Sequence, residues 1–169
     1  MRGGKIIVVA IAALLGLPPT SVAQSVRERS EQGETARVPR GDPDMEAAFR
    51  KARATLDQFL KIIRERRRTI TSYAVKVPIR QGDRTEYFWI NELQQRDERF
   101  IGRISNAPRS VTNVSEGQRI SFERRDIVDW LYRENGRMFG NYTACALIKR
   151  EKPAEAEEFK KRYGLNCDP

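Results

Sequence analysis

The spacing of apolar residues changes from a helical period to a strand period near residue 71, and this change limits the possible folds more than any other feature. In residues 45–63, apolar side chains recur at intervals of three and four, which is typical of one face of a helix. In residues 71–79, apolar side chains alternate with other residues, which indicates a strand. A helix followed by strands predicts an α+β fold.

The helical segment carries start signals that place it at residues 43–67. Asp42 is a favourable N-cap, Pro43 is tolerated at the first helical position, and Asp44 suits the positive end of the helix. We expect its apolar face to pack on a sheet, although such a face also suits a membrane surface.

The strand pattern continues toward the C-terminus, with short connections. Strands are predicted at residues 71–79, 85–93, 99–104, 118–123, 130–134 and 137–143. The long connection between the third and fourth has room for a further short strand at residues 111–114. Short connections favour antiparallel pairing. We therefore expect a long N-terminal helix packed on a curved, mainly antiparallel sheet of five to six strands, barrel-like if its edges meet.

The last two strands form a predicted hairpin. Asn135-Gly136 separates two apolar-rich runs, and both residues tolerate the positive φ angles of a type I′ turn. We expect the second strand to continue through residue 149, with Gly140 marking a bulge or a close backbone approach. A short C-terminal helix is predicted at residues 153–163, because it starts with proline and is followed by Gly164.

The N-terminus resembles a secretory signal. Two basic residues precede an apolar stretch at residues 6–17, which is shorter than the roughly 20 residues that span a bilayer, and small residues end the segment at Ala23. We expect a signal peptide at residues 1–23 and a periplasmic or secreted mature chain from Gln24, with no membrane span after cleavage. Residues 24–41 are polar and predict a flexible linker, and residues 42–169 form one domain.

Cys145 and Cys167 are the two cysteines of the chain. In an exported protein an even number of cysteines favours a disulfide. The rival interpretation is a reactive or metal-binding thiol pair, which usually shows a CxxC spacing or neighbouring histidines. The sequence has neither, so we predict a structural disulfide and no metal site.

The chain has no histidine. This excludes histidine-dependent nucleophilic catalysis and histidine-ligated zinc. Acid chemistry would depend on carboxylates, of which Glu86, Glu92, Asp126 and Asp129 are the candidates. Asp126 and Asp129 also stand where aspartates cap a helical turn or accept backbone N–H groups at a hairpin. We therefore predict no catalytic residue and no cofactor, and keep a carboxylate-based hydrolase of cell-wall polymer as the alternative.

The chain is basic, which favours anionic partners. Its formal net charge is +9, and removal of Arg2 and Lys5 with the signal leaves +7. Because we expect the chain to be exported, we expect no nucleic-acid partner. The densest run, residues 64–68, falls at the predicted end of the first helix, where arginines favour the helix dipole and are usually solvated.

A binding site is predicted around two tryptophans and the second run of the hairpin. Tryptophans either fill the gap between a helix and a sheet or stack on a ligand. The predicted binding residues are Trp89, Asn106, Asp129, Trp130, Asn141, Tyr142 and Thr143.

Four segments together resemble a known family. They read DPDMEAAFRKARATLDQF, EYFWI, FIGRISNAP and DIVDWLYRENGRMFGNYTACAL, and they cover residues 42–147. The chain resembles the bacterial YegJ-like group called domain of unknown function 2314 (DUF2314). The resemblance implies a fold unit and an exported bacterial protein, and no reaction, catalytic residue or cofactor. A basic residue is usual in that family near the position of Cys145, so the cysteine pair looks like an addition to this member.

Together these features favour a non-catalytic periplasmic binding or interaction module. Its partner would be another protein or an anionic component of the envelope, and its oligomeric state is open. A protein inhibitor or immunity factor is a further alternative, which would expose a large apolar patch.

Overall fold

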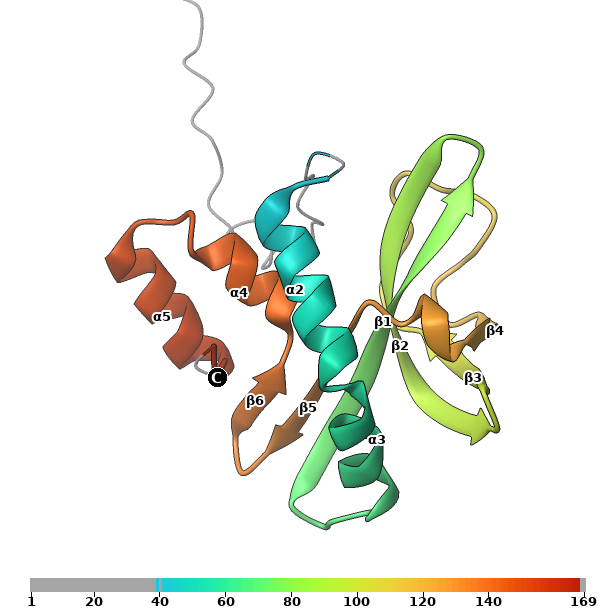
Figure 1. Ribbon diagram of the computed structural model, residues 1–169, viewed down its shortest axis with the longest axis horizontal. Helices are drawn as coiled ribbons and strands as arrows, with labels where there is room; N and C mark the ends of the chain where they lie inside the picture. The colour runs from blue at the N-terminus through green and yellow to red at the C-terminus, as the bar shows by residue number, and fades with distance from the viewer. Residues whose placement is uncertain (1–38, 40, 168–169) are drawn as a thin grey trace, which may run out of the picture.

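A computed structural model describes residue 39 and residues 41–167 (Figure 1). The predicted signal segment lies outside the described residues, as does nearly all of the predicted linker. The described part is an α+β domain in which helices α2 and α3 precede a six-stranded sheet and helices α4 and α5 follow it. None of the described helices is both long and apolar enough to cross a membrane.

The N-terminal helical segment is two helices rather than one. Helix α2 (Pro43–Ala54) starts as predicted, because the side chain of Asp42 accepts a hydrogen bond from the Met45 N–H. The predicted single helix over residues 43–67 is wrong, since Thr55 leaves helical geometry and α3 (Leu56–Arg64) follows. The Thr55 hydroxyl donates to the carbonyl of Lys51 at 2.8 Å, a bond that bends helices.

The sheet is antiparallel throughout, in the order β4-β3-β2-β1-β5-β6. Its strands are β1 (Ile70–Gln81), β2 (Arg84–Arg96), β3 (Arg99–Ile104), β4 (Arg119–Glu123), β5 (Asp129–Glu134) and β6 (Arg137–Gly140). A single turn of 3₁₀ helix, η1 (Arg124–Asp126), connects β4 to β5. The six antiparallel strands confirm the predicted sheet.

The sheet is open, so the expected barrel-like closure is wrong. Strands β4 and β6 form its two edges. The outer edge of β6 is instead occupied by the C-terminal tail, because the Met138 N–H donates to the Gly164 carbonyl at 2.7 Å and Met138 accepts from the Asn166 N–H at 2.9 Å. The tail therefore takes the hydrogen-bonding groups that a closing strand would need.

The Asn135-Gly136 hairpin turn forms as predicted, with φ angles of 50° and 76°. The strand predicted beyond it is wrong. Strand β6 ends at Gly140, Asn141 adopts left-handed geometry, and helix α4 (Tyr142–Ile148) replaces the expected strand. The close backbone approach predicted at Gly140 is confirmed, because a Cβ there would collide with the backbone and ring of Trp130.

Two further predictions concern connections and the C-terminus. Residues 111–114 form no strand and belong to the loop between β3 and β4. Helix α5 (Pro153–Tyr163) forms as predicted and ends at Gly164, which has a φ of 62°.

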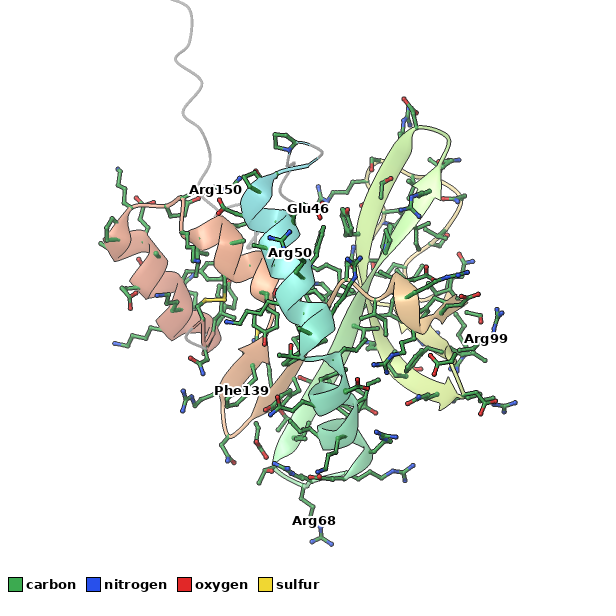
Figure 2. The ribbon with its side chains drawn as sticks, viewed as in Figure 1. Glu46, Arg50, Arg68, Arg99, Phe139 and Arg150 are labelled. Carbon is green, nitrogen blue, oxygen red and sulfur yellow. A yellow bond between two sulfur atoms is a disulfide. The ribbon has the colours of Figure 1, made fainter. Side chains whose placement is uncertain are left out.

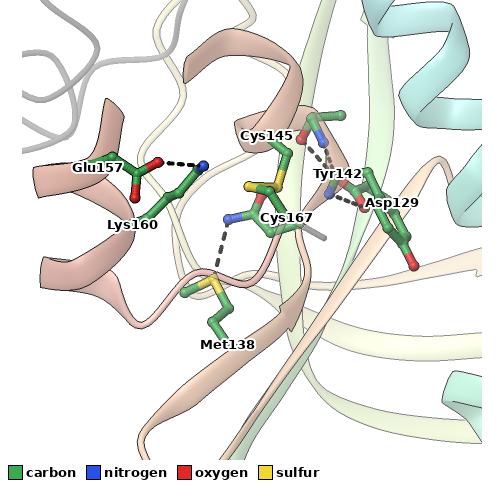
Figure 3. The surroundings of a disulfide bond; sticks show 9 residues. Asp129, Met138, Tyr142, Cys145, Glu157, Lys160 and Cys167 are labelled. Atoms are coloured by element: carbon green, nitrogen blue, oxygen red, sulfur yellow. Dashed lines mark hydrogen bonds and ion pairs between the residues drawn. A yellow bond between two sulfur atoms is a disulfide. The ribbon is translucent and has the colours of Figure 1, made fainter. Parts of the chain in front are cut away.

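The disulfide joins Cys145 and Cys167, whose Cα atoms lie 5.6 Å apart (Figure 3). Cys145 lies on α4, in the stretch predicted as a continuation of the second hairpin strand, so the bond ties the tail beyond α5 to a helix. Phe159, Ile148, Met138 and Leu165 pack around it as a small second core. The main core lies between α2, α3 and the sheet and includes Phe59, Leu60, Val75, Phe88, Ile90 and Trp130.

Candidate functional site

Three of the neighbouring strands place a polar row on one face of the sheet. In the strand register Lys76 of β1 stands opposite Asp129 of β5 on one side and opposite Trp89 of β2 on the other. Residues directly opposite in antiparallel strands project to the same face. The row therefore brings together an acid, a cation and an aromatic ring from distant parts of the sequence.

Asp129 is fully buried, with 0% of its surface exposed, and each of its oxygens accepts hydrogen bonds. Oδ1 accepts from the backbone N–H groups of Trp130 at 2.9 Å and Tyr142 at 3.2 Å. Oδ2 accepts from the N–H of Thr143 at 2.9 Å and from its hydroxyl at 2.7 Å. These bonds fix the start of α4, which has no side-chain cap from Asn141 (Figure 3). The expectation that Asp129 accepts backbone N–H groups is confirmed.

Lys76 is the member of the row that the sequence did not single out as a site residue. Its Nζ donates to the Thr143 hydroxyl at 2.6 Å and lies 4.4 Å from the centre of the Trp89 ring. The Thr143 hydroxyl donates to Asp129 in turn, so it links the ammonium to the carboxylate. The sequence feature that could have identified Lys76 is a lysine within the alternating pattern of a half-buried strand, and that feature is too common to indicate a site.

Burial acts on both charged groups of the row. It raises the pKa of Asp129, and the Lys76 ammonium and the donors from Thr143 and Trp130 act in the opposite direction. Burial likewise lowers the pKa of Lys76, and Asp129 opposes that shift. Burial outweighs these opposing contacts at both groups, so the pKa of Asp129 lies above its ordinary value and that of Lys76 lies below it.

Trp89 and Asn106 are coupled through the backbone. The Asn106 side chain accepts from the Trp89 N–H at 2.9 Å, and the Ser105 N–H donates to the Trp89 carbonyl at 2.9 Å. Asn106 thus braces β2 where Trp89 projects. The Trp89 ring is partly exposed.

Trp130 lies in the main core. It is 6% exposed, stacks on Phe59 with ring centres 5.0 Å apart, and donates its indole N–H to the Ala52 carbonyl at 3.0 Å. This burial matches the gap-filling role weighed for tryptophan. The ring supports Tyr142, which meets it edge-on at 5.4 Å.

Tyr142 and Asn141 stand at the start of α4. The Tyr142 ring is partly exposed, with Lys51 Nζ 5.1 Å from its centre and its hydroxyl 3.3 Å from that of Thr55. Asn141 has a φ of 51°, and its N–H donates to the Trp130 carbonyl at 2.7 Å. Of the seven predicted residues, Asp129, Trp130, Asn141, Tyr142 and Thr143 are thus in mutual contact, and Lys76 links Thr143 to Trp89.

The remaining candidate acids are separately engaged. Glu86 is 5% exposed and accepts from the backbone N–H groups of Arg109, Ser110 and Val111 and from the Ser110 hydroxyl, which anchors the loop between β3 and β4. Burial opposes its ionisation, but these donors outweigh burial and hold the pKa of Glu86 below its usual value.

Asp126 and Glu92 complete the set of candidate acids. Asp126 accepts from the Glu123 N–H at 2.9 Å within a capping box, which confirms the capping role considered for it. Glu92 is exposed and pairs with Arg103 at 3.1 Å and Arg119 at 3.6 Å. Within the described residues, no group of three acids or cysteines is placed to hold a metal ion.

Comparisons with known proteins place this site in a family domain. A family model described as "Uncharacterized protein conserved in bacteria (DUF2314)" matches residues 42–167. The uncharacterized protein YegJ of Escherichia coli is 35% identical over 116 residues, which cover 69% of this chain and 74% of YegJ. A putative ankyrin repeat protein of Neisseria meningitidis serogroup B is 29% identical over 137 residues, covering 76% of this chain and 54% of that protein. No solved structure matches.

Proposed function

We propose that this chain, which belongs to the bacterial DUF2314 family, is a non-catalytic binding module of the cell envelope. Its partner is a protein or an envelope component that carries negative charge. The contact lies on the Lys76–Trp89 surface, which we define as Lys51, Lys76, Trp89 and Tyr142. The first residues of the chain, with their signal-like pattern, support export to the periplasm or beyond.

One observation carries the proposal: the buried acids Asp129 and Glu86 are satisfied by donors of the fold, whereas the Lys76 ammonium forms no ion pair with a carboxylate of the described residues. Asp129 and Glu86 each hold backbone donors, as described above. The Lys76 ammonium instead meets a hydroxyl and an aromatic face, with no carboxylate within ion-pair distance among the described residues. A cation beside partly exposed rings suits a carboxylate or phosphate of a partner.

The alternative, a carboxylate-based hydrolase, needs one acid to donate a proton and a second to act near it. Asp126 caps a 3₁₀ turn and Glu92 is paired with two arginines. Asp129 accepts four hydrogen bonds and has no exposed surface. These engagements weigh against the hydrolase and favour binding.

The proposal is tested by affinity capture from periplasmic extract with the purified protein as bait. We expect wild type to recover a partner at low salt, and Trp89→Ala and Lys76→Gln to lose most of it. Lys161→Gln, an exposed lysine on α5, is the matched control and should capture as wild type does. Equal recovery by all four baits, or recovery by none, would refute the Lys76–Trp89 surface.

A further inference from the structure

The central hairpin of the sheet separates at one end. Strands β1 and β2 are paired from Val75–Ile90 to Gln81–Arg84, next to the turn that joins them. Beyond Ile90, residues 91–96 of β2 pair with β3, while residues 70–74 of β1 pair with β5. Figure 1 shows the two strands diverging there, with α3 beside the opening. We call this the β1–β2 gap.

Each side of the β1–β2 gap is a strand edge. Alternate N–H and C=O groups of a strand point to each side, so a strand with one neighbour presents a row of unpaired groups on the other side. Residues 70–74 and 91–96 have neighbours only on their far sides among the described strands. The gap therefore has two facing backbone edges.

The point where the strands part holds a buried polar atom without a partner. The side-chain oxygen of Asn91, which directly follows the last β1–β2 pair, is buried and accepts no hydrogen bond from the described residues. The next residue, Glu92, has a φ of 50° and lies in a β-bulge opposite Arg103 and Ile101. Bulges end pairing and often occur next to binding sites, and a buried acceptor without a donor needs an explanation.

A groove of about 520 Å³ lies in the gap, within the size range of ligand sites. Its apolar lining comes from Ile63, Tyr73, Leu93 and Phe100. Its polar lining includes Gln94 and Gln95 on β2 and two residues with left-handed backbone, Arg66 and Asp97.

The charge around the groove is mainly positive. Arg64 and Arg66 line it, and the exposed Arg68 and Arg96 lie in the adjoining chain. No ion pair joins these four arginines to a carboxylate of the described residues, and Asp97 is the acid in the lining. Figure 2 shows Arg68 below the start of β1 and Arg99 near the start of β3, on opposite sides of the opening.

We propose that the β1–β2 gap binds an extended peptide segment in which apolar and acidic residues alternate, and that the segment adds to the sheet as a strand between β1 and β2. Its backbone pairs with the two edges, its apolar side chains contact the groove lining, and its carboxylates meet the arginines around the groove. About six residues, roughly 20 Å of strand, match the length of the free edges. The site is separate from the Lys76–Trp89 surface, so either site can fail without the other.

The test uses two displayed hexapeptide libraries, one alternating apolar residues with Asp or Glu and one alternating them with Lys. The acidic library should be enriched on wild-type protein and the basic library should not. A fluorescent copy of an enriched peptide should bind Arg66→Glu/Arg68→Glu at least about tenfold more weakly, a change of about 1.4 kcal/mol. Arg80→Glu, at the exposed far end of β1, and Trp89→Ala should bind within about twofold of wild type.

Hydrogen exchange locates the bound peptide. Amides of residues 70–74 and 91–96 should be protected, and a peptide methylated on its backbone nitrogens should not bind. The proposal is overturned if the acidic library shows no enrichment over the basic one. It is also overturned if the arginine reversals have no effect, or if protection appears at Lys76 and Trp89 instead. Partner capture through Trp89 would survive each of these results.

Discussion

Glu86 and Asp129 are two buried carboxylates that anchor neighbouring backbone in the same way, but their pKa values are shifted in opposite directions. Each carboxylate accepts three backbone N–H groups and one hydroxyl, and each anchors a segment that follows the next strand along the chain. Yet the pKa of Glu86 is lowered and that of Asp129 is raised, with burial the leading influence on both. The donors outweigh burial at Glu86, a residue that is 5% exposed, and do not outweigh it at Asp129, which is 0% exposed.

The neighbours of the two anchors also differ. Glu86 holds an irregular loop with exposed residues, whereas Asp129 holds the start of α4 and shares Thr143 with Lys76. A disulfide further ties α4 to the C-terminal tail. Asp129 thus stabilises the fold and also contacts, through Thr143, a residue of the Lys76–Trp89 surface, whereas Glu86 only stabilises the loop between β3 and β4.

The largest expected difference between Glu86 and Asp129 is the loss in the free energy of unfolding when each carboxylate is removed. Asp129→Ala leaves four buried donors without their acceptor, so we expect a loss of about 3–5 kcal/mol in the free energy of unfolding. Glu86→Ala leaves donors nearer to solvent and should cost about 1–3 kcal/mol. Urea unfolding at neutral pH measures both. An equal or larger cost for Glu86→Ala would contradict the difference.

Loss of the disulfide should affect only the Asp129 side. The bond closes a loop with a sequence separation of 22, and replacing both cysteines by alanine should cost about 3 kcal/mol. Hydrogen exchange should rise in α4 and α5 and stay unchanged in the loop held by Glu86. Free thiols in the native protein, found by mass measurement, would refute the bond itself.

The two hydroxyl donors give a smaller, matched comparison. Thr143 is 3% exposed and its hydroxyl is engaged by both Asp129 and Lys76, so we expect Thr143→Val to cost about 1–2 kcal/mol. Ser110→Ala removes the exposed hydroxyl that donates to Glu86 and should cost less than about 1 kcal/mol. Thr143→Ser, which keeps the hydroxyl, should retain most of the wild-type stability. If it does not, the loss in Thr143→Val comes from packing and not from the hydroxyl.

The pH dependence of stability should have opposite signs at the two carboxylates. The folded pKa of Glu86 lies below its ordinary value of 4.5, so its stabilising effect is present above that value and is lost as the pH falls through the folded pKa. The folded pKa of Asp129 lies above 3.8, so protonation favours the folded state and stability from this group falls as the pH rises through the folded pKa.

Glu86→Gln and Asp129→Asn measure these contributions, as the difference in unfolding free energy from wild type between pH 3 and 7. The expected scale is about 1.4 kcal/mol for each unit of pKa shift. Slopes of the same sign in the two variants would contradict the comparison.

Local rules predicted the elements whose ends are fixed by single residues. Asp42, the Asn135-Gly136 turn and Gly164 each impose a backbone geometry that few residues satisfy, and all three act as expected. The strand predicted beyond Asn141 was wrong. An apolar stretch is compatible with both a helical and a strand period, and only the left-handed turn at Asn141 selects a helix. The break at Thr55 was invisible for a related reason, since the apolar spacing continues across it.

The candidate site was predictable only in part. Asp129, Tyr142 and Thr143 are close in the sequence and were identified together. Lys76 was missed because its partners lie on β2 and α4, and only the strand register brings them into contact. The β1–β2 gap likewise depends on which strand pairs with which, information that the alternating pattern of a single strand does not contain.

The most direct test of a non-catalytic role is the release of soluble fragments from purified cell-wall polymer, measured with the mature protein between pH 4 and 8. We predict release no greater than in buffer alone across this range, because the candidate acids are engaged by the fold. Release above buffer that disappears in Glu92→Gln or Asp126→Asn, both checked for native folding, would contradict the binding role and establish the hydrolase.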